Sequence, residues 1–454
     1  MELTRDPDVR EAHSRDASGL HLTADLVARP SDAAEVQEVV REAIRLGVSV
    51  TPAGSQTSMT GASITDAGLL MSVTAMKRIL DIDVEERTAR VEPGLTIGEL
   101  NRALRETGLQ FAPDPTSEND ATIGGAIACN ASGARTLRHG PTRRHVRALT
   151  VVDADASAAR YVRTTIEKNT VGFASIQDPV DWYVGSEGTL GVVVEADLAL
   201  VPLPANLVGL AVPFPDEASA LRFVVAAREM RSRQPHCLEY FDDQALAIAG
   251  AAMRRPWDDG ARAMIYLEDD AGEEPLDSLL DEWLSLAEGN GAATADIRAF
   301  DTQQSLREAR EFRHAVPATM NERGSAQTRH GGRKVSTDWS VPYRRLAEIL
   351  EMSRGSCARH GAPPPVTYGH AGNGHPHQNF IAEDPAALDR IHAAIGETLR
   401  QVVEMGGTYS AEHGVGKLKK GWLELQLSAP QIAVMRSIKY ALDPKGLFSP
   451  GNIL

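Results

Sequence analysis

Cysteine is scarce in this chain. Its 454 residues include three, Cys129, Cys237 and Cys357, which are far apart and form no C-x-x-C pair. An odd number of distant cysteines supports neither a disulfide framework nor a zinc ribbon, and it indicates reduced thiols in a cytoplasm. Basic residues are also in deficit, with 47 Lys and Arg against 62 Asp and Glu and no long Lys/Arg run. This balance argues against nucleic acid as a partner.

Long apolar runs are missing as well. No uninterrupted stretch approaches the length of a bilayer span, and the first residues are charged and lack the apolar segment of an export signal. We therefore expect no transmembrane segment and a cytoplasmic protein, with peripheral docking at the inner membrane left open.

Two common nucleotide-binding motifs are absent. The chain has neither G-x-G-x-x-G nor G-x-x-x-x-G-K-[ST]. A nicotinamide enzyme of the usual kind and a nucleotide triphosphatase are therefore disfavoured.

The length predicts two or three domains. In the first half, apolar positions at helical spacing follow a possible cap at Ser31 and Asp32 and end at Gly47, and Thr96 and Glu99 form a capping box for a second helix. Strand-like segments surround these helices: 48–52, 69–92, 148–153 and 191–200.

A proline-rich segment, 201–206, is typical of a linker and places a domain boundary there. Beyond it the patterns predict strands at 208–214, 236–241 and 262–268 and helices at 216–230 and 275–288. This order favours an α+β sheet with helices on one face.

Three loops of small residues precede residue 192. Residues 52–62, 122–134 and 185–191 are rich in Gly, Ser, Thr and Asn, which present backbone N–H and hydroxyl donors and let a ligand approach the backbone. Three such loops in one domain indicate one large, extended ligand.

Histidines gather near the end of the chain. His370, His375 and His377 lie in a Gly-rich segment, and a Glu412-His413 pair follows. Gly and Pro make a helix unfavourable here, so we expect the imidazoles to project from a strand end or a bend. Imidazole and carboxylate are ligands of zinc and similar ions, and three protein ligands leave one coordination position open for a substrate. Of Glu412 and His413, one is expected to bind the metal while the other handles a proton.

These segments resemble a known family. The loops above, with 168–173, resemble the FAD-binding domain of the vanillyl-alcohol oxidase superfamily. Residues 370–377, 412–416 and 443–451 resemble its D-2-hydroxyacid branch, which includes D-lactate dehydrogenases, D-2-hydroxyglutarate dehydrogenases and the flavin subunit of glycolate oxidase. The resemblance runs from about residue 25 to the end.

The resemblance implies an α+β, two-domain flavoprotein. An FAD-binding domain of two α/β subdomains would occupy 1–205. A C-terminal α+β substrate domain with an antiparallel sheet would occupy 206–454, carrying the metal site and a tail that contacts FAD.

The resemblance also implies roles for individual residues. His370, His377 and Glu412 would bind a divalent metal, zinc first, and His413 would be the catalytic base. Arg313, with Lys334 as a second candidate, would hold the substrate carboxylate. The residues expected to bind FAD are Pro52, Gly54, Ser55, Gln56, Thr57, Ser58, Gly61, Pro115, Thr122, Gly124, Gly125, Asn130, Ser132, Gly133, Glu187, Gly188, Gly191, Val192 and Asn452.

The activity implied is oxidation of a D-2-hydroxy acid, D-lactate first, to the 2-keto acid, with the C2 hydride passing to flavin N5. FAD would be dissociable, and the electrons would pass to a quinone, a cytochrome or an electron-transfer flavoprotein. A homodimer is expected from the family. The rivals are the flavin subunit of a glycolate oxidase complex, a synthase that uses FAD without net oxidation, and a non-catalytic FAD-binding subunit.

One departure from the family pattern concerns the metal. The family usually has Gly-Asp-Gly-Asn-Leu-His, where this chain has Gly372-Asn373-Gly374-His375-Pro376-His377. The added imidazole of His375 is open to three uses: a donor that supports the ligands, an additional ligand, or a substrate contact.

Overall fold

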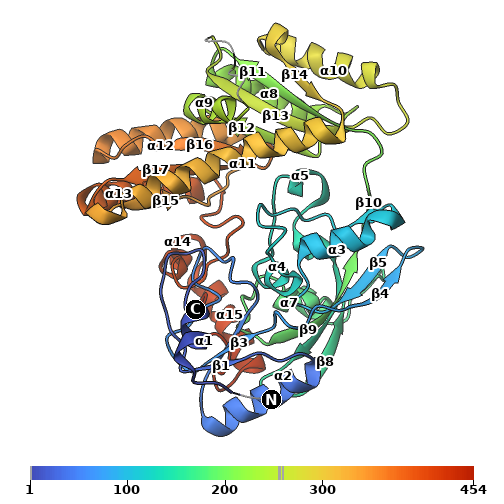
Figure 1. Ribbon diagram of the computed structural model, residues 1–454, viewed down its shortest axis with the longest axis vertical. Coiled ribbons are helices and arrows are strands. Elements are labelled where there is room, and N and C mark those ends of the chain that lie inside the picture. Colours follow the sequence, from blue (N-terminus) through green and yellow to red (C-terminus); the bar gives the residue numbers. More distant parts are fainter. Residues whose placement is uncertain (1–2, 254–256, 258–259) are drawn as a thin grey trace. The chain divides into compact units, whose positions relative to one another are not determined.

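The computed structural model describes residues 3–253, 257 and 260–454, which form two compact units (Figure 1). The first unit consists of Met1–Gly133, His139–Leu203 and Glu412–Leu454, and the second of Ala134–Arg138 and Pro204–Ala411. The sequence-based division at 205/206 therefore lies close to the boundary between Leu203 and Pro204, but it assigns the tail differently. The tail belongs with the first unit because Phe448 forms a β-bridge with Val50 there and is fully buried.

The first unit contains two main sheets. One is parallel with strand order β1-β3-β2, and the other is antiparallel with order β4-β5-β9-β7-β8. Its elements are α1 (Pro7–Ala12), β1 (Leu26–Ala28), α2 (Ala33–Leu46), β2 (Val50–Ala53), β3 (Leu69–Ser72), β4 (Ile79–Asp83), β5 (Thr88–Val91), α3 (Ile97–Leu104), β6 (Leu109–Gln110), α4 (Ile123–Cys129), β7 (Val146–Val152), β8 (Ala158–Val162), α6 (Ala174–Gln177), α7 (Val180–Tyr183), β9 (Val192–Ala199), β10 (Val201–Pro202), α14 (Leu423–Gln426) and α15 (Ala429–Leu442).

The helix signals of the first half are confirmed. Asp32 caps α2 by accepting from the N–H of Glu35, and Gly47 ends the helix at φ 66°. Thr96 and Glu99 form the predicted capping box of α3, which begins at Ile97. These caps satisfy N–H groups that the first helical turn leaves without an intrahelical acceptor.

The second unit is built on one seven-stranded antiparallel sheet with order β14-β11-β13-β12-β16-β17-β15. Its elements are β11 (Leu207–Phe214), α8 (Glu217–Glu229), β12 (Cys237–Phe241), α9 (Asp243–Ala252), β13 (Ala263–Asp270), α10 (Leu276–Gly289), β14 (Arg298–Phe300), α11 (Gln303–Ala326), β15 (Arg333–Ser336), α12 (Leu346–His360), β16 (Val366–His370), β17 (His375–Ala382) and α13 (Pro385–Glu404). The short α5 (Thr136–His139) begins in the small segment that joins this unit.

Helices cover both faces of this sheet, so the prediction of helices on one face is wrong. On one face, Phe312 of α11 packs its ring 5.9 Å from that of Phe241 and 5.5 Å from that of Tyr266. On the other, Phe380 of β17 clusters with Cys357 of α12 and Ile391 of α13. The central strand β12 is buried at every position, the pattern of a strand covered on both sides.

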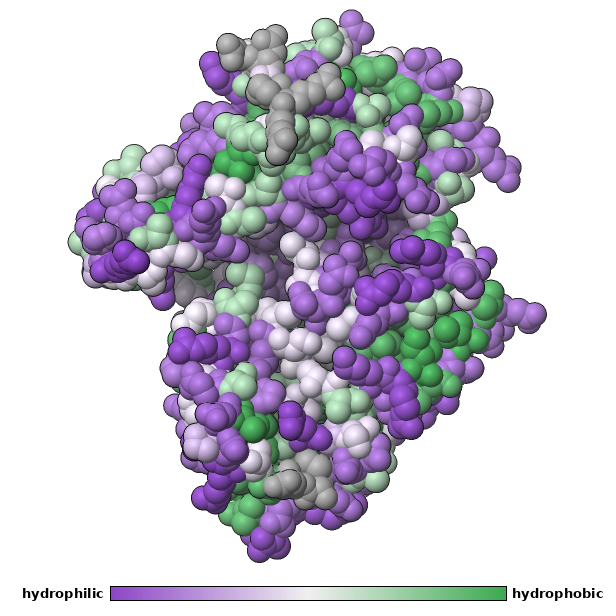
Figure 2. Space-filling view, in the orientation of Figure 1, coloured by the Kyte–Doolittle hydropathy of each residue, from purple (hydrophilic) through white to green (hydrophobic). Residues whose placement is uncertain are grey.

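On the face shown in Figure 2, hydrophilic residues predominate, with hydrophobic ones gathered in a few small areas. Within the described residues, we find no helix that combines the length and apolarity needed to cross a bilayer.

Candidate functional site

The histidines lie on one β-hairpin of the second unit. His370 ends β16, a short turn at Ala371–Asn373 follows, and β17 begins at His375, which confirms the prediction of a strand end. Gly374 closes the turn at φ 68°, where an added Cβ would meet the carbonyl oxygen of Val341 at 1.9 Å. Only glycine fits this position.

The imidazoles of this hairpin lie against one another. His370 and His375 are paired across the two strands, and the ring centroids of His370 and His377 are 5.2 Å apart. Residues 375 and 377 share a face of β17 because side chains alternate along a strand. The hairpin therefore presents its histidines together.

Among the described residues, His370, His377 and Glu412 are the one group of His, Cys and acidic side chains placed to hold a metal ion. Their ligand atoms all lie within 4.8 Å of one another. Ligands held at about 2.0–2.2 Å by a tetrahedral zinc ion stand about 3.4 Å apart. Two imidazoles and a carboxylate fit zinc or a similar divalent ion.

Glu412 and His413 sit in a chain segment that is fixed on both sides. Ala411 donates its N–H to the carbonyl of Asp338 at 2.8 Å, and Ser132 Oγ donates to Glu412 Oε1 at 3.1 Å. The Thr60 hydroxyl donates to the carbonyl of His413 at 3.4 Å. The bonds at Ala411 and His413 restrict the backbone, and the bond from Ser132 restricts the carboxylate of Glu412.

Glu187 holds the chain just beyond His413. Its carboxylate accepts from the N–H groups of Val415 at 2.5 Å and Gly416 at 2.7 Å. Burial raises the pKa of Glu187, although these two backbone donors oppose the shift. The structure thus gives a residue predicted to contact FAD a second use, as a brace for the His413 segment.

His375 has protein partners of its own. Its Nδ1 lies 2.7 Å from the carbonyl oxygen of Trp339, and its Nε2 lies 3.6 Å from Asp338 Oδ1. It is not a member of the three-residue group. Among the three uses left open by the sequence, this geometry fits a supporting donor best.

The two predicted carboxylate anchors differ in their surroundings. Arg313 is paired with carboxylates of its own unit, with Nη2 3.2 Å from Glu239 Oε2 and Nη1 3.9 Å from Glu268 Oε1. The ammonium of Lys334 donates to Asn321 Oδ1, and burial lowers its pKa. The assignment of either residue to a substrate stays a prediction.

Two polar residues near the histidines were missed by the sequence reasoning. Glu239 Oε1 lies 2.7 Å from His370 Nδ1. Asn379, two residues after His377, is buried, and its amide atoms make no normal hydrogen bond among the described residues, although Tyr368 lies close enough for the amide to affect its pKa. An acidic residue within the apolar strand Cys237–Phe241 was the available signal for Glu239, because carboxylates are rarely buried without a partner.

The glycine-rich loops predicted to bind FAD converge in the first unit. An added Cβ on Gly54 would lie 2.2 Å from Thr122 Oγ1, and one on Gly188 would lie 2.6 Å from Pro52 Cγ. The N–H of Glu187 also donates to Ala128 at the end of α4, at 2.8 Å. Glycine at 54 and 188 therefore lets the side chains of Thr122 and Pro52 approach closely, which brings the three loops together.

The other predicted FAD residues lie along these loops. They are Ser55, Gln56, Thr57, Ser58 and Gly61 after β2, Pro115 before α4, Gly124 and Gly125 within it, Asn130, Ser132 and Gly133 after it, Gly191 and Val192 at the start of β9, and Asn452 in the tail. The amide of Asn452 is used by the protein, donating to Ala62 at 2.8 Å and accepting from Lys417 at 2.7 Å.

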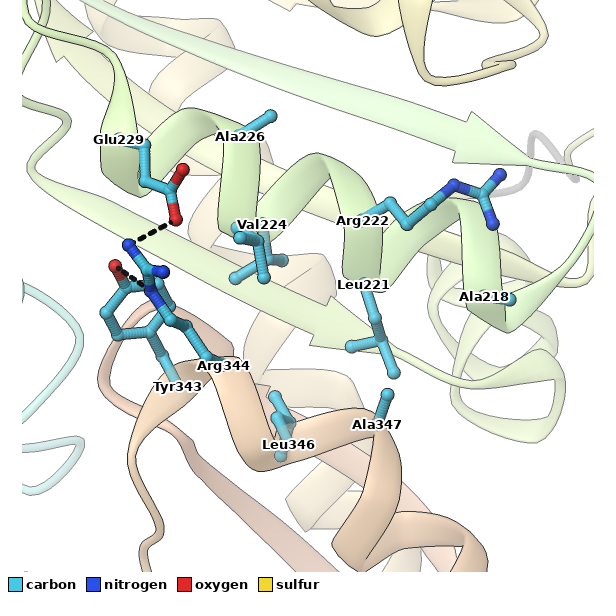
Figure 3. A pocket seen from close by; sticks show the side chains of 11 residues that line it. Ala218, Leu221, Arg222, Val224, Ala226, Glu229, Tyr343, Arg344, Leu346 and Ala347 are labelled. Atoms are coloured by element: carbon cyan, nitrogen blue, oxygen red, sulfur yellow. Dashed lines mark hydrogen bonds and ion pairs between the residues drawn. The ribbon is translucent and has the colours of Figure 1, made fainter.

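A pocket of 510 Å³ opens in the second unit between α8 and α12 (Figure 3). Leu221 and Val224 line one side and Leu346 the other, with an ion pair of 2.7 Å between Arg344 and Glu229. None of the predicted site residues lines it. Substrate binding is therefore argued from the histidine hairpin.

Sequence comparisons place both units in known families. Residues 24–160 match the family described as "FAD binding domain", and residues 203–453 match "FAD linked oxidases, C-terminal domain". The three cysteines are free.

Three curated relatives align over nearly the whole chain. D-2-hydroxyglutarate dehydrogenase of Xanthomonas citri pv. viticola is 31% identical, with 100% of this chain and 94% of the relative covered. D-lactate dehydrogenase of Archaeoglobus fulgidus is 30% identical, with 94% and 91% covered. Glycolate oxidase subunit GlcD of Bacillus subtilis is 29% identical, with 98% and 92% covered.

A solved structure of alkyldihydroxyacetonephosphate synthase superposes on 99% of this chain and 82% of its own, with TM-score 0.74 and 19% identity. This likeness establishes the fold alone. Together with the family matches, it confirms the predicted α+β, two-domain fold of the vanillyl-alcohol-oxidase type. The chain belongs to the FAD-linked oxidases.

Proposed function

We propose that this FAD-linked oxidoreductase oxidises a D-2-hydroxy acid, D-lactate first, to the 2-keto acid with the help of a divalent metal ion. The observation that carries the proposal is the group of His370, His377 and Glu412, with His413 as the next residue in the chain. Relatives named as D-lactate and D-2-hydroxyglutarate dehydrogenases support the substrate class.

His370, His377 and Glu412 would hold the metal, with zinc as the first candidate. Three protein ligands would leave a fourth position for one substrate oxygen, and expansion to five ligands would admit both the carboxylate and the C2 hydroxyl. When bound, the flavin supplies a hydride acceptor and the metal ion a Lewis acid that makes the hydroxyl more acidic.

His413 would take the proton from the C2 hydroxyl oxygen. An imidazole titrates near neutral pH and can accept that proton during turnover. The bonds that Thr60 and Glu187 make to its segment hold the backbone of this base in place. A fixed base is effective because proton transfer requires hydrogen-bond distance.

Arg313 and Lys334 are the proposed cations for the substrate carboxylate. One N–H of Arg313, at Nε, is buried without a hydrogen-bond partner among the described residues. The buried amide of Asn379 adds a group able to donate and accept. Buried polar groups usually have partners, so these atoms support a polar ligand at this face of the sheet.

FAD would be held without a covalent bond by the three converging loops. The electrons would leave to a quinone, a cytochrome or an electron-transfer flavoprotein. A second candidate, the flavin subunit of a glycolate-oxidising complex, rests on the likeness to the GlcD subunit. We also propose a cytoplasmic homodimer, which membrane fractionation and light scattering would test.

The test is an anaerobic titration of the FAD-loaded, zinc-loaded protein with D-lactate, L-lactate, glycolate and D-2-hydroxyglutarate. We expect one D-acid, or achiral glycolate in the second candidate, to bleach the visible band of oxidised flavin. Chelation should abolish the bleaching and added Zn²⁺ should restore it. A yellow protein that none of these acids bleaches would contradict the proposal and favour a non-redox synthase.

A further inference from the structure

A chain of buried charged groups runs behind His370 in the second unit. His370 Nδ1 lies 2.7 Å from Glu239 Oε1, and Glu239 Oε2 accepts from Arg313 at 3.2 Å. Arg313 also lies 3.9 Å from Glu268, and Glu268 accepts from Arg135 Nη2 at 2.9 Å. The chain therefore alternates carboxylate and guanidinium from the histidine inward.

Each link is held by a separate element. Glu239 lies on β12 and Glu268 on the neighbouring β13, while Arg313 reaches them from α11. The Tyr266 hydroxyl donates to the remaining oxygen of Glu268 at 3.0 Å. Strands and helix thus fix the carboxylate of Glu239 in front of His370.

Glu268 and the two arginines beside it, Arg135 and Arg313, are held in their charged forms. Burial alone would raise the pKa of Glu268, but Arg135 and Arg313 lower it to about 2. Glu268 is 1% exposed, so its charge is compensated by these cations and not by water. The charged carboxylate of Glu268 therefore helps to hold the guanidinium of Arg313 beside Glu239.

Stability alone is a poor explanation for this arrangement. Replacing a buried ion-pair network by well-packed apolar side chains is often neutral or stabilising. This network lies on the face of the sheet where Phe312 and Tyr266 build an apolar core. Its outer end meets the imidazole of His370.

We propose that Glu239, fixed by Arg313 and Glu268, is a positioning residue that keeps the proton of His370 on Nδ1 and directs Nε2 to the metal. A carboxylate accepts only, so the imidazole nitrogen facing it must be the donor. The other nitrogen then keeps its lone pair for a ligand bond. A histidine held in this way by a carboxylate is a more basic and better oriented ligand.

This inference rests on the proposed metal site, and its test separates the two. The purified, FAD-loaded protein is stripped of metal and titrated with Co²⁺, followed by calorimetry and by the visible Co²⁺ absorption spectrum. The variants are Glu239→Gln, which keeps an oxygen acceptor, and Glu239→Ala. Glu412→Gln removes a proposed ligand and reports whether the bound Co²⁺ occupies this site.

Asp269→Asn is the matched control. Asp269 is the neighbour of Glu268 on β13, is 4% exposed and accepts from the indole of Trp283 at 3.0 Å. The substitution therefore removes a buried carboxylate from the same strand without touching the chain behind His370. It should leave Co²⁺ affinity and spectrum unchanged.

We expect Co²⁺ to bind about 10-fold more weakly to Glu239→Gln and about 100-fold more weakly to Glu239→Ala, with an altered absorption spectrum. If Glu239→Ala does not fold, the Gln variant decides. Affinity within twofold of the wild type and an unchanged spectrum in the Gln variant would overturn the inference and leave the proposed function standing. A wild-type protein that binds no Co²⁺ would overturn both.

Discussion

At the scale of single residues, His413 has the most direct part in the proposed chemistry. Its carbonyl accepts from Thr60, and the N–H groups of Val415 and Gly416, two and three positions later, donate to Glu187. These contacts involve only the backbone around residue 413. A change of the imidazole leaves these backbone bonds in place.

We expect His413→Asn to slow reduction of the flavin by the substrate by about 10²–10⁴-fold, the usual contribution of a general base. The proton of the C2 hydroxyl would then have no acceptor. The rate is measured by anaerobic stopped-flow absorbance. FAD content and Co²⁺ affinity should stay at wild-type values, because the side chain is proposed neither as a metal ligand nor as an FAD contact.

The control for this change is His330→Asn, at an exposed histidine that follows α11. It should reduce flavin at the wild-type rate. A His413→Asn protein that is reduced as fast as the wild type would exclude residue 413 as the base.

At the scale of elements, the brace made by Glu187 can be tested apart from any contact with FAD. We expect Glu187→Ala to lower the melting temperature of the apoprotein, since the N–H groups of Val415 and Gly416 lose their acceptor and each buried orphan costs about 1–3 kcal/mol. Glu187→Gln keeps one acceptor oxygen, so its melting temperature should lie between those of the wild type and Glu187→Ala. The melting temperature is followed by circular dichroism without FAD.

Glu195→Ala is the comparison, because Glu195 is half-buried on the nearby β9 and accepts from Thr150 at 3.2 Å. Glu195→Ala should lower the melting temperature of the apoprotein less than Glu187→Ala does. If Glu187→Ala leaves the apoprotein unchanged and weakens only FAD binding, then the contact predicted from sequence is the one that matters.

The elements themselves were readable from local sequence. Caps at Asp32 and Thr96 predicted the helix starts, and Gly and Pro around the histidines predicted a strand end or a bend, because these signals act within a few residues. Glu239 could not be paired with His370 in advance, since the two are 131 positions apart and meet only through sheet order. The covering of both sheet faces was missed for the same reason, since it depends on how distant helices pack.

At the scale of the whole molecule, stability should depend on pH through Asp242. Burial raises the pKa of this carboxyl from 3.8 to about 7, although the N–H groups of Ala245 and Thr367 oppose the shift. An acid whose folded pKa is raised stabilises the fold fully below pH 3.8, and this contribution is lost as pH rises through about 7.

We therefore expect the wild type to lose unfolding free energy relative to Asp242→Asn as the pH rises from 5 to 8, because Asn does not titrate. The limit is about 1.4 kcal/mol for each pKa unit. Urea unfolding at several pH values measures it. For Asp243→Asn, at the exposed neighbour, the unfolding free energy should change with pH as it does in the wild type. The same pH dependence in Asp242→Asn would exclude a contribution from the titration of Asp242.

The tail links the two ends of the chain within the first unit. Phe448 is fully buried in a cluster with Val50, Leu69 and Met71, and it bridges to Val50. Tyr440, eight positions earlier, is 72% exposed. The two aromatics therefore offer a matched pair for testing whether the FAD-binding unit needs the tail in order to fold.

We expect Phe448→Ala to cost about 3–5 kcal/mol, the usual effect of removing a buried Phe, and so to lower the melting transition of the first unit by roughly 10 °C. Added FAD identifies that transition in a calorimetric scan, because a ligand of the folded unit raises its melting temperature. Tyr440→Ala should leave the melting temperatures of both units, the FAD-sensitive and the FAD-insensitive transition, unchanged. A Phe448→Ala protein in which only the FAD-insensitive transition moves would show that the tail belongs to the second unit, as the division at residue 205 implied. If the FAD-sensitive transition moves, the first and last segments of the chain fold together around the cofactor.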